Sequence, residues 1–143
     1  MAVANLITKN SDEHQFSFEV LPPLKGTGTD KLFADIDKLK EFDPAYINIT
    51  THHSEFVYKE LENGQFERQR IRRRPGTIAI AAAIQQRYHI PVQPHVICSG
   101  ATIEDIEYEL LDLQFLGITD LLLLRGDKAK EDSMFKPTPG GHA

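Results

Sequence analysis

The sequence predicts an α/β protein in which parallel strands are joined by helical crossovers. Short apolar stretches of strand type alternate with segments of helical periodicity in the order β-α-β-α-β-α-β. The expected strands begin about 30, 46 and 29 residues apart, and such spacings are typical of parallel strands with crossovers. A small doubly wound sheet and the first half of a (β/α)8 barrel both fit this order. A whole barrel needs about 250 residues, whereas this chain has 143 and finishes in a loop after the fourth strand. We therefore expect the N-terminal half of a TIM barrel.

The composition is that of a soluble globular protein, with 41% hydrophobic and 26% charged residues. The net charge of -5 argues against a nucleic-acid partner. The one cysteine, Cys98, excludes an intrachain disulfide and fits a reducing compartment. There is no signal-peptide pattern at the N-terminus and no apolar run long enough to span a membrane. We expect a cytoplasmic protein with no membrane partner.

The first strand, residues 16–20, alternates apolar and polar side chains and is stopped by Pro22-Pro23. Glu19 lies in this strand between bulky apolar neighbours, which is unusual for a solvated face. On the inner wall of a site, partial desolvation would raise its pKa and make it a proton donor near neutral pH. The alternative is a solvated glutamate on an edge strand.

The next expected helix starts at Thr29 or Asp30, either of which can cap it, and ends at Asp43-Pro44. Its apolar positions are Leu32, Phe33, Ile36, Leu39 and Phe42. The second strand, residues 46–50, places Ile47 and Ile49 on one face.

Residues 51–74 form a long polar connection in which a short helix near residues 56–62 is expected. Its second half carries five arginines: Arg68, Arg70, Arg72, Arg73 and Arg74. This run is either a solvated loop or a contact to a phosphate-bearing ligand or a neighbouring subunit.

Two more helices and two more strands complete the pattern. Pro75-Gly76-Thr77 opens a helix, and Ile90-Pro91 introduces a strand over residues 92–98. A capping-box start at Thr102 predicts a helix that ends at Gly117. Its expected apolar face is Ile106, Leu110, Leu113 and Leu116. Residues 121–124 are four leucines, as expected for a buried parallel strand.

Polar side chains recur where the four strands end, at Glu19, Thr50, His95, and Arg125 with Asp127. We expect them to lie at one level, because the carboxyl ends of parallel strands share an edge, where ligands bind. Ser17, Asn48 and Gln93 come two residues earlier on the same faces. Burying such groups unpaired would cost roughly 1–3 kcal/mol each, so packing alone does not account for them.

Several common sites have no counterpart in the sequence. There is no G-x-G-x-x-G after a strand, no phosphate-binding G-x-x-x-x-G-K-[ST] and no serine in a nucleophile elbow. His52 and His53 are adjacent rather than spaced for zinc, and we expect no metal.

Four motifs together resemble the methylenetetrahydrofolate reductase family, in its order and near its spacings. They are Phe16-Ser17-Phe18-Glu19 followed by Pro22-Pro23, Asn48-Ile49-Thr50, Pro94-His95, and Leu124-Arg125-Gly126-Asp127. The resemblance covers the chain from about residue 15 to the end. It implies that residues 1–143 form a partial reductase barrel domain whose second half is absent.

The resemblance also implies a function and roles for individual residues. The family reduces 5,10-methylenetetrahydrofolate to 5-methyltetrahydrofolate in one-carbon and methionine metabolism, using FAD and a hydride from NADH or NADPH. Glu19 matches the family's catalytic acid and, with Asp127, contacts the folate substrate. The implied cofactor-binding residues are Thr50, Thr51, His53, His95, Arg125, Gly126 and Asp127. Thr51 and His53 stand where better-known bacterial members carry an aromatic residue and then small ones.

Two other functions fit the same residues. One is a flavin-free lyase-type barrel enzyme that uses Glu19 and His95 as an acid/base pair. The other is a non-catalytic half-barrel that acts as an assembly module. An open four-stranded sheet exposes apolar edges, so we also expect a homo-oligomer. We expect these 143 residues alone to bind FAD poorly and to show little reductase activity.

Overall fold

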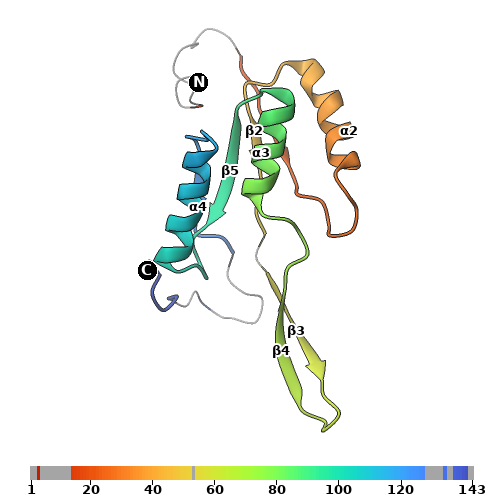
Figure 1. The fold of residues 1–143 in the computed structure, drawn as a ribbon, viewed down its shortest axis with the longest axis vertical. Helices are drawn as coiled ribbons and strands as arrows, with labels where there is room; N and C mark the ends of the chain where they lie inside the picture. Colours follow the sequence, from red (N-terminus) through yellow and green to blue (C-terminus); the bar gives the residue numbers. More distant parts are fainter. Residues whose placement is uncertain (1–2, 4–13, 53, 128–133, 135–136, 142–143) are drawn as a thin grey trace.

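The computed structural model describes residues 3, 14–52, 54–127, 134 and 137–141. Four parallel strands form one sheet in the order β1-β2-β5-β6, with helical crossovers between them (Figure 1). The strands are β1 (Phe18–Val20), β2 (Ile47–Ile49), β5 (Val92–Ile97) and β6 (Leu122–Leu124). The helices are α2 (Asp30–Leu39), η1 (Lys40–Phe42), α3 (Thr77–Tyr88) and α4 (Ile103–Phe115). This architecture confirms the predicted α/β class and is consistent with half of a TIM barrel.

The hydrophobic core lies between one face of the sheet and the helices. Val20, Ile49 and Val92 contribute to it from the strands. The helices add Leu32 and Ile36 from α2, Ile80, Ala81 and Ile84 from α3, and Leu113 from α4. Because strand side chains alternate, the residues between these positions point to the opposite face, which the helices do not cover. In a closed barrel that opposite face is the interior.

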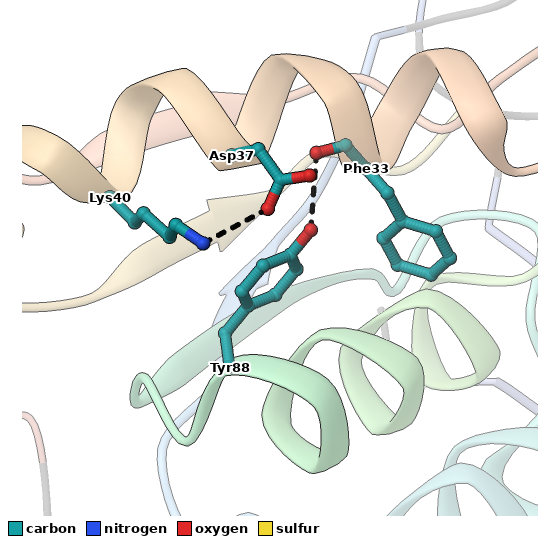
Figure 2. A network of polar contacts seen from close by, with 4 residues as sticks. All are labelled: Phe33, Asp37, Lys40 and Tyr88. Carbon is teal, nitrogen blue, oxygen red and sulfur yellow. Dashed lines mark hydrogen bonds and ion pairs between the residues drawn. The ribbon is translucent and has the colours of Figure 1, made fainter.

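Polar contacts join the C-terminal end of α3 to α2 (Figure 2). The Tyr88 hydroxyl donates a hydrogen bond to the carbonyl oxygen of Phe33 at 3.1 Å. On the same side, the Lys40 ammonium lies 3.2 Å from the Asp37 carboxylate and lowers the pKa of that carboxyl. Arg87 stacks over the Phe33 ring, with 4.5 Å between the guanidinium carbon and the ring centre. These contacts fix the crossover helices against each other.

The connection between β2 and α3 differs from the prediction. In place of a loop with a short helix, it forms an antiparallel hairpin of β3 (Glu55–Glu60) and β4 (Phe66–Ile71). Asn63-Gly64 turns the chain, with φ 76° at Gly64 and a hydrogen bond from the Leu61 amide to the Gln65 carbonyl. Asn-Gly between two alternating segments is a strong hairpin signal that outweighs the weak helical pattern. Figure 1 shows the hairpin projecting away from the sheet and helices.

Helix boundaries follow the predictions with three corrections. The capping box at Thr102 and Asp105 is formed as expected. Thr29 is the N-cap of α2 but makes no side-chain cap bond. The helix continues only as a 3-10 turn to Phe42, whose side chain is exposed, because Asp43 adopts a left-handed conformation. Leu110, expected on the packing face of α4, is exposed.

None of the helices in the described part of the chain is long and apolar enough to cross a membrane.

Candidate functional site

Parallel pairing aligns three polar residues of the strands on the face that the helices leave uncovered. Glu19 pairs in register with Asn48, and Asn48 with Gln93. The Asn48 amide donates a hydrogen bond to the Ser17 hydroxyl at 3.3 Å. The polar groups expected two residues before the strand ends are therefore brought together on one face.

The register corrects one part of the prediction. Glu19 is level with Asn48 and Gln93, whereas Thr50 and His95 lie two residues further along their strands. The reason is that β1 ends at Val20 before the prolines, so Glu19 precedes the true strand end. Thr50 is half-buried, and its hydroxyl donates to the Val20 carbonyl at 3.4 Å.

His95 is the most enclosed of the predicted site residues that the structure describes, with only 8% of its surface exposed. Its carbonyl oxygen accepts a hydrogen bond from the Thr77 hydroxyl at 3.2 Å, which ties β5 to the first turn of α3. Its Nε2 atom is buried and has no hydrogen-bond partner among the described residues. Burial lowers the pKa of His95, and the negative charge of nearby Glu19 partly opposes that shift. The imidazole is therefore mainly neutral at pH 7, with one nitrogen available to a ligand.

Glu19 does not lie in the dry environment that the sequence led us to expect. Its side chain is exposed, and the described residues do not cover it. The two phenylalanines that flank it do not enclose it, because Phe16 is itself exposed and packs edge-on against Phe18. Glu19 and His95 share the uncovered face of the sheet with β2 between their strands, and the charge of Glu19 acts on His95 across it.

The segment after β6 turns away from the sheet at Gly126, where φ is 82°. A side chain would be strained in this conformation, so glycine is needed there. The Ser99 amide donates to the Arg125 carbonyl at 3.2 Å, which joins this turn to the end of β5. The side chains of Arg125 and Asp127 are exposed. Of the remaining predicted residues, Thr51 is half-buried, and His53 lies outside the described residues.

Two groups of residues that support the site were not predicted from the sequence. Arg74 donates a hydrogen bond to the Pro22 carbonyl, and the Lys25 amide donates to the Arg73 carbonyl at 2.7 Å. The base of the hairpin therefore holds the loop that follows Glu19. Thr77 was expected only to open a helix. Its position directly after Pro75-Gly76, at a helix start that faces a strand, is a signal that could have identified it as a residue supporting the site.

The arrangement offers hydrogen-bonding groups to an organic cofactor or substrate. A neutral imidazole with an orphaned nitrogen can bond a polar atom of a ligand, and the glycine turn lets a ligand approach the backbone. Within the described ranges, no three histidine, cysteine, aspartate or glutamate side chains are placed to hold a metal ion.

Comparison with known proteins matches this chain to one enzyme family. The family model "Methylenetetrahydrofolate reductase" matches residues 5–143. "Methylenetetrahydrofolate reductase (NADH) 1" of Arabidopsis thaliana is 28% identical over 145 residues, which cover 100% of this chain and 22% of the relative. The protein of the same name from Zea mays is 27% identical over 128 residues, covering 90% and 19%. "5,10-methylenetetrahydrofolate reductase" of Pectobacterium carotovorum subsp. carotovorum is 26% identical over 115 residues, covering 80% and 33%.

The chain thus spans about a fifth to a third of the length of these relatives. The family model, by contrast, accounts for nearly all of the chain itself. On that match, the chain belongs to the methylenetetrahydrofolate reductase family.

Proposed function

We propose that this chain supplies part of the active site for reduction of 5,10-methylenetetrahydrofolate to 5-methyltetrahydrofolate, with NADH or NADPH as the hydride source. The observation that carries the proposal is the buried His95, whose Nε2 lacks a partner among the described residues on the sheet face that it shares with Glu19. The family membership gives this arrangement its chemistry. The names of the plant relatives specify NADH, which favours NADH here. We also propose that the protein serves cytoplasmic one-carbon metabolism, on the route to methionine.

FAD is the cofactor that the family membership supports, and the hydrogen-bonding groups at this end of the sheet, His95 Nε2 among them, are suited to hold it. When bound, FAD would supply hydride transfer between the nicotinamide and the folate. His95 would hold a polar atom of the cofactor through Nε2. Thr50, Thr51, His53, Arg125 and Gly126 would complete its binding surface.

Glu19 would act as the general acid toward the folate. Its carboxyl proton goes to the ring nitrogen as the bond between that nitrogen and the methylene carbon breaks, and the five-membered ring opens. The methylene carbon, left bonded to the other nitrogen as an iminium, gains the hydride and becomes the methyl group. Water then returns a proton to Glu19. Its exposed position in the described residues means that ligands and further protein must supply the dry surroundings that favour this role.

Asp127 would lie beside the flavin and the folate. A carboxylate there disfavours negative charge on the reduced flavin and so tunes its potential. Because Gly126 directs the chain at this point, the placement of Asp127 depends on that turn.

We further propose that residues 1–143 are the N-terminal half of the catalytic barrel and have little activity alone. Leu122 and Leu123 of the outermost strand, β6, are exposed rather than buried as the sequence predicted, because β6 has a neighbouring strand on one side only. A fifth strand and its helix would cover them. Turnover of menadione or folate by the 143-residue chain with FAD and NADH would contradict this part of the proposal.

The test of the function uses the natural protein that contains this sequence. We expect flavin absorbance bands, bleaching on addition of NADH or NADPH, and reoxidation by 5,10-methylenetetrahydrofolate. A colourless protein would favour a lyase-type enzyme that uses Glu19 and His95. A protein whose cellular role survives Glu19→Gln would favour the non-catalytic assembly module.

A further inference from the structure

Helix α4 carries its most exposed apolar side chains on the face turned away from the core. Tyr108, Leu111 and Phe115 are 69%, 61% and 90% exposed, and their spacing of three and four residues places them in one row. The buried residue of the helix, Leu113, faces the opposite way into the core. Amphipathic surface helices normally have a polar outer face, so this apolar row is unusual.

Completion of a barrel would not cover this row. A fifth strand would pair along β6 and hide Leu122 and Leu123, and its helix would pack on a flank of α4. The row on the outer face points away from the sheet and from both flanks. Its occupant must therefore approach from outside the barrel.

The charge of α4 restricts the occupant. Between residues 103 and 115 the helix has five acidic side chains and no basic one. Pairing of α4 with α4 from another copy would bring these acids together, which is unfavourable. The row therefore fits a partner that combines aromatic and positively charged side chains.

The hairpin of this same chain presents such a surface. Phe66, Arg68 and Arg70 alternate along β4 and share one face, and β3 adds Tyr58 and Glu60 to that face. Phe66 is 66% exposed, and Tyr58 and both arginines are also exposed. At residues 66–74 the chain carries five arginines and one glutamate. The hairpin is therefore complementary to α4 in charge and in aromatic character.

The dimensions of the two surfaces also match. Six residues of β4 extend about 20 Å at 3.4 Å per residue, and the thirteen residues of α4 extend about 20 Å at 1.5 Å per residue. Alternate residues of β4 recur about every 7 Å, near the 4.5–6 Å steps of the row on α4. The β4 face can thus lie along the helix over its whole length.

Within one chain only the base of the hairpin reaches α4, where Arg70 and Arg72 act on Asp105, and Arg72 also acts on Glu109. Figure 1 shows the hairpin projecting away from the body, with its tip far from α4. The capping hydrogen bond from Thr102 is the main cause of the lowered pKa of Asp105, and Arg70 and Arg72 add smaller contributions.

We propose that two copies of this chain exchange hairpins, so that the β3–β4 hairpin of each copy packs on the outer face of α4 of the other. The contact is reciprocal, which gives a closed two-fold dimer with two identical hairpin–helix contacts. Aromatic and leucine side chains form the centre of each contact, and the arginines of β4 face the acids of α4.

Sedimentation velocity on the 143-residue chain tests the proposal. The unmodified chain is expected to be a dimer at micromolar concentration. Leu111→Asp with Phe115→Asp, and separately Phe66→Asp with Tyr58→Asp, should each raise the dimer Kd at least 100-fold, because central apolar and aromatic anchors dominate interfaces. Leu24→Asp removes an exposed leucine outside both surfaces and should leave the Kd within about threefold. Circular dichroism should show all variants folded, since the altered side chains are exposed.

Cysteine cross-linking identifies which surfaces meet. In a Cys98→Ser background, a Phe66→Cys chain mixed with a Leu111→Cys chain should form an intermolecular disulfide, and neither chain alone should do so. A monomeric unmodified chain overturns the proposal. So does a dimer that survives the hairpin variant, which would mean that the copies meet through another surface, such as the open edge of β6. A Leu111→Cys chain that cross-links to itself also overturns the proposal, because α4 would then pair with α4.

Discussion

His95 and Thr77 are two buried polar residues that should respond to apolar substitution in opposite directions. Both are 8% exposed, yet the Thr77 hydroxyl has a partner, whereas Nε2 of His95 has none among the described residues. A buried polar atom without a partner costs about 1–3 kcal/mol. His95→Leu has a similar volume and removes that atom, so it should raise the free energy of unfolding by about 1–3 kcal/mol. Thr77→Val should lower it by about 1 kcal/mol, because a net favourable hydrogen bond is lost.

Urea unfolding followed by far-ultraviolet circular dichroism at pH 8 measures both changes. At this pH the imidazole is neutral in the folded and unfolded states, so its titration does not contribute. The reasoning is refuted if His95→Leu destabilises the chain by 1 kcal/mol or more, because Nε2 would then be making a favourable contact. A gain in stability would mean that the fold keeps a costly polar atom, which is typical of a site held ready for a ligand.

The remaining predictions concern pH, the segment around Gly141 that contacts the start of α4, and the core. Because burial lowers the folded-state pKa of His95, the unfolded state binds the proton more readily than the folded state. The free energy of unfolding should therefore fall as the pH drops below about 6.5, by at most about 1.4 kcal/mol per pH unit from this group. His95→Leu should remove that component in urea titrations from pH 8 to 5. Gly141→Ala should lower the melting temperature, because a Cβ there would lie 2.6 Å from the Ala101 carbonyl oxygen, whereas Gly76→Ala has open space and should change it little. Ile84→Ala should cost about 2–5 kcal/mol in urea unfolding, since its side chain is fully buried; a loss below 1 kcal/mol would contradict the described core.

The sequence predicted the parallel sheet well because its strands and helices carry clear local signals. Thr102 with Asp105 has the spacing of a capping box, and the structure forms it. Ile47 and Ile49 alternate with polar residues, and both are fully buried as expected. Such signals act within a few residues and do not depend on the rest of the chain.

Predictions that depend on distant parts of the chain were less successful. The position of Glu19 along its strand relative to His95 depends on the register of β1 with β2, and this register is not encoded in the local sequence. Solvent exposure of Glu19 depends on what surrounds the strand end, and the described residues leave it open. The hairpin was missed although Asn63-Gly64 signalled it, because the charged residues around it obscured the alternation.

The proposed role of Glu19 is the central claim, and separate measurement of the two half-reactions tests it most directly. In the natural flavoprotein, Glu19→Gln should leave reduction of the flavin by NADH within about threefold of the unmodified rate. Reoxidation by 5,10-methylenetetrahydrofolate should slow by about 100-fold or more, because a positioned general acid contributes 10²–10⁴-fold. Stopped-flow absorbance of the flavin follows both steps. Equal loss in both half-reactions, or no loss in the second, would contradict the assignment of Glu19 as the acid that opens the folate ring.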